Sequence, residues 1–170
     1  MLGRFSIAPA TPPLVPCGVA RFRLFLMYWL PILVWMAVIF SASGDTRSWQ
    51  HSSRIIAPIV RWLFPSLPDD SVRTIVFVVR KGAHLTEFAI LALLTWRALR
   101  QPIPGQSRPW RWSLATQVIL LVMLYAASDE FHQRFVPHRE ASVVDVLIDT
   151  TGAVLALLSL WAVGRWRKWW

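Results

Sequence analysis

The sequence has few charged residues and almost no cysteine. Charged side chains make up 16% of the 170 residues, whereas hydrophobic side chains make up 55%. A single cysteine, Cys17, excludes an internal disulfide and a cysteine-based metal framework. A soluble domain of this size would have to hide more apolar surface than one core can hold, whereas a lipid bilayer accepts long apolar runs directly. The composition therefore predicts a membrane protein with one domain.

Long apolar stretches account for most of the chain. A bilayer core needs about 20 mostly apolar residues per helix, and four stretches have this character: residues 22–40, 81–96, 112–128 and 143–164. Pro31 removes a backbone donor from the first stretch and is expected to kink it, which membrane helices tolerate. The predicted fold class is all-α, a polytopic membrane protein with a bundle of four transmembrane helices.

Basic residues flank these stretches unevenly. Because Lys and Arg in short loops remain on the cytoplasmic side, we predict a multi-pass membrane protein with both termini in the cytoplasm. The connection between the third and fourth stretches is nearly neutral and is placed outside. Three basic clusters carry this prediction: Arg4, Arg21 and Arg23; Arg97, Arg100, Arg108 and Arg111; and Arg165, Arg167 and Lys168.

The net charge of +9 does not by itself indicate nucleic-acid binding. The arginines lie at the ends of predicted helices and do not form one basic face, so membrane orientation and contact with anionic lipid explain them. We expect membrane lipids as partners and no nucleic acid.

The ends of the chain differ from its centre. Residues 1–20 include a proline-rich stretch and are predicted to be a disordered cytoplasmic N-terminus. Residues 21–166 form the predicted transmembrane domain, and residues 167–170 a cytoplasmic tail of basic residues and tryptophan, which prefer headgroup depth. The alternative for the first stretch is a cleaved signal peptide with residues 41–43 as its small-residue site. An uncleaved helix is favoured, because the stretch is longer than a usual signal and its basic flank lies deep in the chain.

Residues 41–80 are too many for an unstructured connection in a compact domain. Apolar residues within 54–64 approximate one helical stripe, which predicts a short interfacial or partly re-entrant helix. A solvated loop with one apolar patch is the alternative. After two prolines, Asp69 or Ser71 is a candidate cap for a new helix that runs into the second apolar stretch.

Polar residues recur with helical spacing on three of the predicted helices. Spacings of three and four residues place the members of each set on one helix face. Under the predicted topology all the sets lie in the outer halves of their helices, so we expect one shared extracytoplasmic pocket. The sets are Lys81, His84 and Glu87; Asp129, Glu130 and Gln133; and Asp145 and Asp149.

Ionisable residues at such a depth are costly, by about 3 kcal/mol each at mid-bilayer, so they usually pair with one another or serve a function. In one interpretation they form a buried network that only fixes helix register, with Lys81 and Arg139 neutralising nearby carboxylates. The number and variety of the charged groups favour a ligand-binding or catalytic pocket instead.

The order of these residues also resembles a known family. The pattern K-x-x-H-x-x-E begins at Lys81, D-E-x-x-Q-x-F-x-P-x-R begins at Asp129, and D-x-x-x-[ND]-x-x-G begins at Asp145. In combination these patterns are similar to those of the VanZ-like family. Two positions depart from them: His138 stands where the family commonly has glycine, and Asp149 stands where it commonly has asparagine. A glycine could supply a positive φ in the turn, and Asp149 makes the pocket more acidic.

The resemblance implies a small multi-helix, multi-pass protein of the bacterial cytoplasmic (inner) membrane that acts in the cell envelope. The founding member of the family is associated with low-level resistance to teicoplanin, a lipoglycopeptide. The resemblance therefore implies an effect on glycopeptide susceptibility as one expectation for this chain.

One class of function is non-enzymatic binding of a lipid-linked or lipidated ligand, such as a lipoglycopeptide. Arg139 and Lys81 would meet phosphate or carboxylate groups, because a guanidinium fork matches oxyanions, and the apolar helices would meet the tail. The predicted ligand-binding residues are Lys81, Asp129, Glu130, Gln133, Arg139 and Asp149.

The other class is an intramembrane hydrolase or transferase acting on an envelope lipid. Glu87 or Asp145 would be the general base, and His84 the general acid or a metal ligand. No nucleophile elbow or triad order is recognisable. The oxygen-rich cluster suits magnesium, manganese or zinc, but no spacing matches a known metal signature, so a divalent metal remains an open alternative and no cofactor is assigned.

Overall fold

The computed structural model describes residues 17–44, 48–101, 109–136 and 142–170, with side chains except those of 17–21, 44 and 48–52. These described ranges contain helices and no strand, which confirms the all-α prediction. The helices are α1 (Cys17–Tyr28), α2 (Leu30–Gly44), α3 (Ser48–Leu63), α4 (Asp69–Arg100), α5 (Trp112–Gln133) and α6 (Val143–Trp166).

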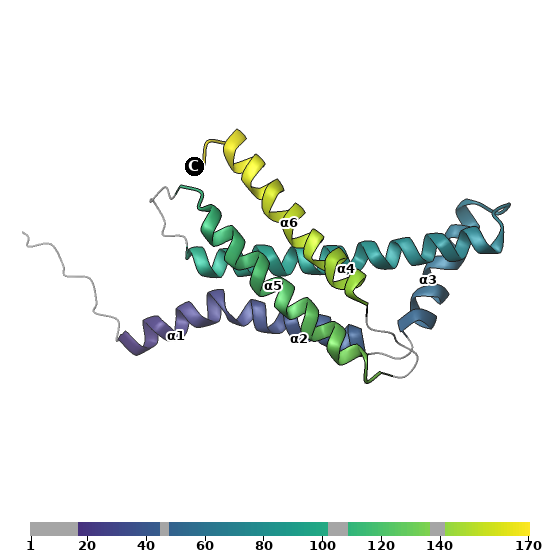
Figure 1. Cartoon of the computed structure of the whole chain (residues 1–170), viewed down its shortest axis with the longest axis horizontal. Helices are drawn as coiled ribbons and strands as arrows, with labels where there is room; N and C mark the ends of the chain where they lie inside the picture. The colour runs from purple at the N-terminus through teal and green to yellow at the C-terminus, as the bar shows by residue number, and fades with distance from the viewer. Residues whose placement is uncertain (1–16, 45–47, 102–108, 137–141) are drawn as a thin grey trace, which may run out of the picture.

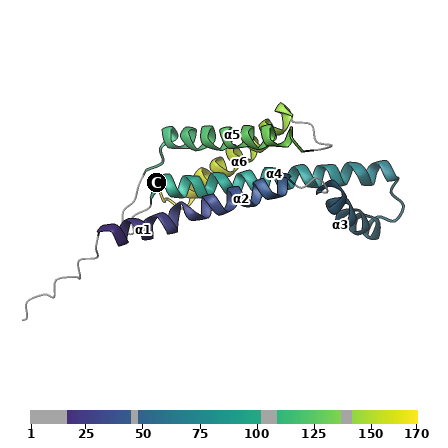
Figure 2. The ribbon, with the colours of Figure 1, turned by 90° about the horizontal axis from the view of Figure 1, so that it is seen from below.

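The long helix α4 is the centre of the fold, and every other helix contacts it (Figure 1). Helices α5 and α6 pack against its C-terminal part, α2 lies beside it, and α3 packs against its N-terminal part (Figure 2). The core between α4, α5 and α6 contains fully buried Phe88 and Val118 together with the small residues Ala92, Ala126 and Ala153. Small residues allow helix backbones to approach closely.

Helices α1 and α2 are two parts of one apolar stretch that bends by about 40° near Trp29. Pro31 has no N–H to donate to the carbonyl of Met27, one turn earlier. Arg97 of α4 supplies a replacement, because its Nη1 donates to that carbonyl oxygen at 3.1 Å. The predicted kink is confirmed, and the arginine from α4 satisfies the carbonyl that the proline leaves without a donor.

Two of the described helices, α5 and α6, are long and apolar enough to cross a membrane, and the bent α1–α2 pair is a third if it counts as one span. Helix α4 is long enough, with 32 residues, but it is less apolar and more charged than these helices. Polar residues such as Lys81, His84 and Glu87 interrupt its apolar character. A bundle of four spans therefore remains a prediction.

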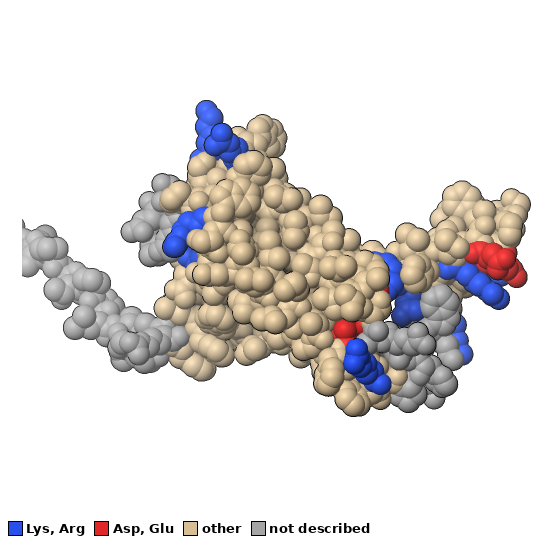
Figure 3. Space-filling view, viewed as in Figure 1, with Lys and Arg blue, Asp and Glu red and all other residues tan. Residues whose placement is uncertain are grey.

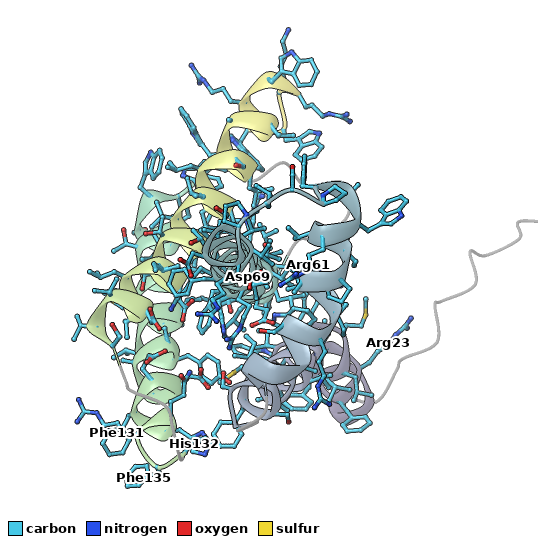
Figure 4. The ribbon with its side chains drawn as sticks, turned by 90° about the vertical axis from the view of Figure 1, so that its right-hand side faces the viewer. Arg23, Arg61, Asp69, Phe131, His132 and Phe135 are labelled. Atoms are coloured by element: carbon cyan, nitrogen blue, oxygen red, sulfur yellow. The ribbon has the colours of Figure 1, made fainter. Side chains whose placement is uncertain are left out.

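The connection between the first two apolar stretches is helical. Helix α3 leaves Ile55, Ile59 and Trp62 exposed, and Arg61 Nη2 lies 2.8 Å from Asp69 Oδ1 at the start of α4 (Figure 4). The helical structure predicted here is confirmed and the solvated-loop alternative is wrong, whereas an interfacial or re-entrant position of α3 stays a prediction.

The new helix after the two prolines is also confirmed, because α4 begins at Asp69 and continues without a break to Arg100. The predicted cap is wrong. Pro68 occupies the N-cap position and no side chain bonds the first turn, since the Asp69 carboxylate instead accepts a bond from Arg61.

Candidate polar site between α2, α4, α5 and α6

The close packing of α6 on α4 brings two of the predicted polar sets together. Gly152 is buried, and a Cβ atom built there would overlap the carbonyl oxygen of Leu85. Asp149 is three residues before Gly152, on the same side of α6, and is only 4% exposed. The Asp149 carboxylate therefore lies about one helical turn from Gly152, where the backbones of α6 and α4 meet.

The rim of the site consists of two pairs of charged groups. Lys81 Nζ of α4 lies 2.5 Å from Asp145 Oδ1 of α6. One turn further along α4, His84 Nδ1 lies 3.5 Å from Glu87 Oε2. These side chains are 26–28% exposed, so the rim is accessible from outside the bundle.

The floor of the site is centred on Asp129 of α5, which is 2% exposed. Its Oδ2 atom accepts hydrogen bonds from Ser43 Oγ at 2.6 Å and from Gln133 Nε2 at 3.0 Å. Its Oδ1 atom is buried and has no hydrogen-bond partner among the described residues. A buried carboxylate oxygen without a donor is costly, which distinguishes Asp129 from an ordinary packed side chain.

Ser43 is a site residue that the sequence analysis missed. It lies at the end of α2 and is 1% exposed. The sequence offers only a weak signal, a small polar residue at the end of an apolar stretch, which also fits the small-residue site of the signal-peptide alternative. Its role depends on the packing of α2 against α5, which no local spacing reveals.

The end of α5 is fastened to its neighbours by two further contacts. Glu130 is buried, and its Oε2 accepts from the backbone N–H of Ser142, which caps the start of α6. The His132 ring stacks on Phe40 of α2, with ring centroids 4.2 Å apart, at the end of α5 seen in Figure 4. Glu130 thus has a structural partner in the backbone of α6, in addition to any contact with a ligand.

The structure places eight of the nine predicted site residues. It brings Lys81 beside Asp145 and His84 beside Glu87, and it buries Asp129, Glu130, Gln133 and Asp149. The ninth, Arg139, lies outside the described residues, as does His138. Their predicted contacts therefore stay predictions.

Carboxylates dominate the charge of the described site. The five are Glu87, Asp129, Glu130, Asp145 and Asp149. In addition to Asp129 Oδ1, the Glu87 Oε2 atom is buried and lacks a hydrogen-bond partner within the described ranges, although His84 is nearby. The described residues contain no group of three or more His, Cys, Asp or Glu that could hold a metal ion. Hydrogen-bond donors of a ligand, such as ammonium, amide or hydroxyl groups, suit these oxygen atoms.

Two serines beside Asp129, in sequence or in space, use their hydroxyl groups in hydrogen bonds within the protein. Ser128 donates to the backbone carbonyl of Tyr125 at 2.7 Å. Ser43 is 1% exposed and donates its hydroxyl proton to Asp129 Oδ2 at 2.6 Å. The partly exposed groups of the site are the two pairs at its rim, Lys81 with Asp145 and His84 with Glu87.

An all-α chain with helices apolar enough to cross a membrane, and with a carboxylate-rich site between its helices, has the features of a small helical membrane protein. The family model described as VanZ/LLP1 matches residues 25–164, and the protein belongs to this family. The match extends the motif resemblance from half of the chain to most of it and includes every described residue of the polar site. No curated protein and no solved structure matches the chain.

Proposed function

We propose that the protein is a multi-pass protein of the bacterial cytoplasmic membrane whose polar site binds the headgroup of a lipid-linked or lipidated ligand of the cell envelope. The observation that carries this proposal is the unpartnered Oδ1 of Asp129, buried between helices whose neighbouring charged pairs, Lys81–Asp145 and His84–Glu87, are partly exposed. A ligand donor in this position would remove the cost of the unsatisfied oxygen.

The length of α4 supports the proposal of four spans. Its 32 residues extend about 48 Å, whereas the hydrocarbon core is about 30 Å thick. The C-terminal part, which packs with α5 and α6, is long enough to fill the bilayer. The N-terminal part extends past the bundle together with α3 (Figures 1 and 2). This arrangement sets Lys81, His84 and Glu87 near one membrane boundary, and the basic ends of the helices orient that boundary away from the cytoplasm.

The surroundings of the rim suit an amphiphilic ligand. Val144 and Leu147 of α6 are exposed on either side of Asp145 in the sequence. Phe131 and Phe135 are exposed at the neighbouring end of α5 (Figure 4). These side chains offer an apolar surface to an acyl tail or a polyprenyl chain, while the polar headgroup lies over the carboxylates.

The charge balance specifies the headgroup further. Lys81 is paired with Asp145, so the described site presents acceptors more than donors. Headgroups with amino, amide and sugar hydroxyl groups can donate to these acceptors. Arg139 would bind an anionic group of the same ligand. Peptide- and sugar-bearing lipids of wall synthesis and lipoglycopeptides such as teicoplanin belong to this class, so altered teicoplanin susceptibility is the phenotype to test.

Complementation tests the proposal. A deletion strain receives the wild-type gene, Glu87→Gln, Asp129→Asn or the control Asp70→Asn at matched membrane levels, and growth is scored against teicoplanin and other envelope-acting compounds. Asp70 is a suitable control because its carboxylate lies at the far end of α4 and its side chain is 96% exposed. We expect the wild type and Asp70→Asn to restore the phenotype and the two site variants to fail.

The same experiment separates the proposal from a network that only fixes helix packing. A packing role would lower the amount of folded Glu87→Gln and Asp129→Asn protein in the membrane. If both site variants accumulate normally and complement fully, the site does not bind a ligand that matters for the phenotype, and the proposal is wrong.

A hydrolase or transferase is the second candidate function, favoured by the accessible His84–Glu87 pair. An enzyme would convert an envelope lipid during incubation with purified protein, and Glu87→Gln would abolish the conversion. A binding protein would return the same lipid unchanged. Mass spectrometry of the extracted lipid distinguishes the two.

A further inference from the structure

The end of the molecule opposite the polar site is built from two ranges of the chain that contain basic but no acidic residues. Residues 88–128 and 150–170 contain no Asp or Glu. In the view of Figure 3, no acidic side chain is visible at the end that carries the C-terminus, whereas both signs of charge are visible at the opposite end. The basic residues of these two ranges are Arg97, Arg100, Arg108, Arg111, Arg165, Arg167 and Lys168.

A pocket opens at this basic end, between the C-terminus of α4 and the N-terminus of α5. We call it the Arg/Trp pocket, and its lining residues are Trp96, Leu99, Arg100, Pro109, Arg111 and Leu114. Two of these side chains are guanidinium groups and none is a carboxylate. The pocket lies about 20 Å along α4 from Glu87, so it is separate from the polar site.

Aromatic rings hold one of the two guanidinium groups in place. Arg100 Cζ lies 4.8 Å from the ring centroid of Trp170 and 5.9 Å from that of Trp96. The Trp170 ring reaches this position because Gly164 has no side chain, and a Cβ atom there would overlap the ring. A cation in contact with two indole rings is oriented in advance for a ligand.

The wall behind the arginine contributes further donors. Trp110 stacks on Trp96 with ring centroids 4.2 Å apart. The indole N–H groups of Trp110 and Trp170 are buried and have no hydrogen-bond partner within the described ranges. The surroundings of the pocket therefore combine positive charge with unsatisfied donors, the reverse of the chemistry of the polar site.

We propose that the Arg/Trp pocket binds a phosphate group, and that this phosphate is the headgroup of an anionic phospholipid. A guanidinium binds two phosphate oxygens with parallel hydrogen bonds, and Arg100 and Arg111 both line the cavity. The lipid is the favoured source because the pocket lies where the apolar bodies of α4 and α5 end and tryptophan accumulates. Tryptophan prefers the headgroup depth of a bilayer.

Native mass spectrometry of the detergent-purified full chain tests the proposal, with dioleoyl phosphatidylglycerol as the probe and dioleoyl phosphatidylcholine as the neutral comparison. The variants are Arg100→Gln, Arg111→Gln and the control Arg167→Gln. Arg167→Gln removes the same charge at the same end of the molecule. Arg167 is a suitable control because it lies outside the pocket, over the Trp169 ring. We expect one retained phosphatidylglycerol, bound about tenfold more weakly by each pocket variant and within about twofold of wild type by the control.

The conservative variant Arg100→Lys adds a second readout. It keeps the charge and removes the planar fork, so we expect binding weaker than wild type and stronger than Arg100→Gln. Thermal unfolding of each purified variant verifies that the helices remain folded.

Three outcomes would overturn the proposal in different ways. Equal loss in Arg100→Gln, Arg111→Gln and Arg167→Gln would mean that charge at this end attracts lipid without a site. Equal retention of phosphatidylcholine would mean that the phosphate charge is not recognised. Displacement of the lipid by inorganic phosphate at a similar concentration would support the phosphate chemistry but assign the pocket to a soluble ligand.

Discussion

The hydrogen bond from Ser43 to Asp129 gives the sharpest test of how the polar site is held together. Ser43→Ala removes the hydroxyl that joins α2 to the floor of the site on α5. Both side chains are almost fully buried, at 1% and 2% exposure, so water cannot easily replace the lost donor. The carboxylate keeps only the bond from Gln133 as a described side-chain partner.

The size of the effect follows from this geometry. A hydrogen bond to a charged group contributes about 1.5–3 kcal/mol, and burial at this site favours the upper part of that range. We expect Ser43→Ala to lower the free energy of unfolding by about 2 kcal/mol, which corresponds to a roughly 30-fold change in the folding equilibrium. The measurement is reversible unfolding in mixed micelles by titration with sodium dodecyl sulfate, followed by circular dichroism.

Ser41→Ala is the matched control. Ser41 is on the same helix, but it is exposed and donates only to the backbone carbonyl of Ala37 at 2.7 Å. We expect this variant to stay within about 0.5 kcal/mol of wild type. A double-mutant cycle of Ser43→Ala with Asp129→Ala should give a coupling energy above about 1 kcal/mol. Equal effects of the two serine variants, or no coupling in the cycle, would refute the idea that this bond fastens α2 to the site.

Three further predictions concern helix packing, the rim and orientation. Gly152→Ala should destabilise the fold by about 1–3 kcal/mol, because the added Cβ atom overlaps α4. Gly82→Ala should stabilise it by about 0.5 kcal/mol, because Gly82 lies on a helix with open space around it. Unfolding titrations of the two variants compare the signs of these changes. Exchanging the ion pair as Lys81→Asp with Asp145→Lys should restore the folded yield that either single change lowers, as measured by size-exclusion chromatography. Phe135→Cys, without the native cysteine, should react in intact cells with a membrane-impermeant maleimide, and protection would contradict the orientation.

The helices were predictable because their signals are local. Apolar stretches predicted α5, α6 and the bent α1–α2 pair, and an apolar stripe predicted α3. The cap of α4 was predicted incorrectly because the Arg61 side chain, brought near by the folding of α3, takes the Asp69 carboxylate.

The candidate site was predictable where its polar residues recur along a helix every three or four positions. The sets around Lys81 and Asp145 face each other as that spacing suggested. The contribution of α2 was not predictable, because a lone serine carries no periodic signal and acquires its role only when α2 packs on α5. The carbonyl that Pro31 leaves free could be foreseen, but not that Arg97, 66 residues further along, would satisfy it.

The separation of basic and acidic residues along the bundle has a consequence in an energised membrane. In the proposed orientation, the acid-free end around the Arg/Trp pocket is on the electrically negative, cytoplasmic side, and the carboxylates of the polar site face the positive side. Reversing the molecule would move each of these charges against the transmembrane potential, at a cost of about 2.3 kcal/mol per elementary charge for 100 mV. Respiration would thus make the functional orientation more stable, and it would do so through residues that also form the two proposed binding sites.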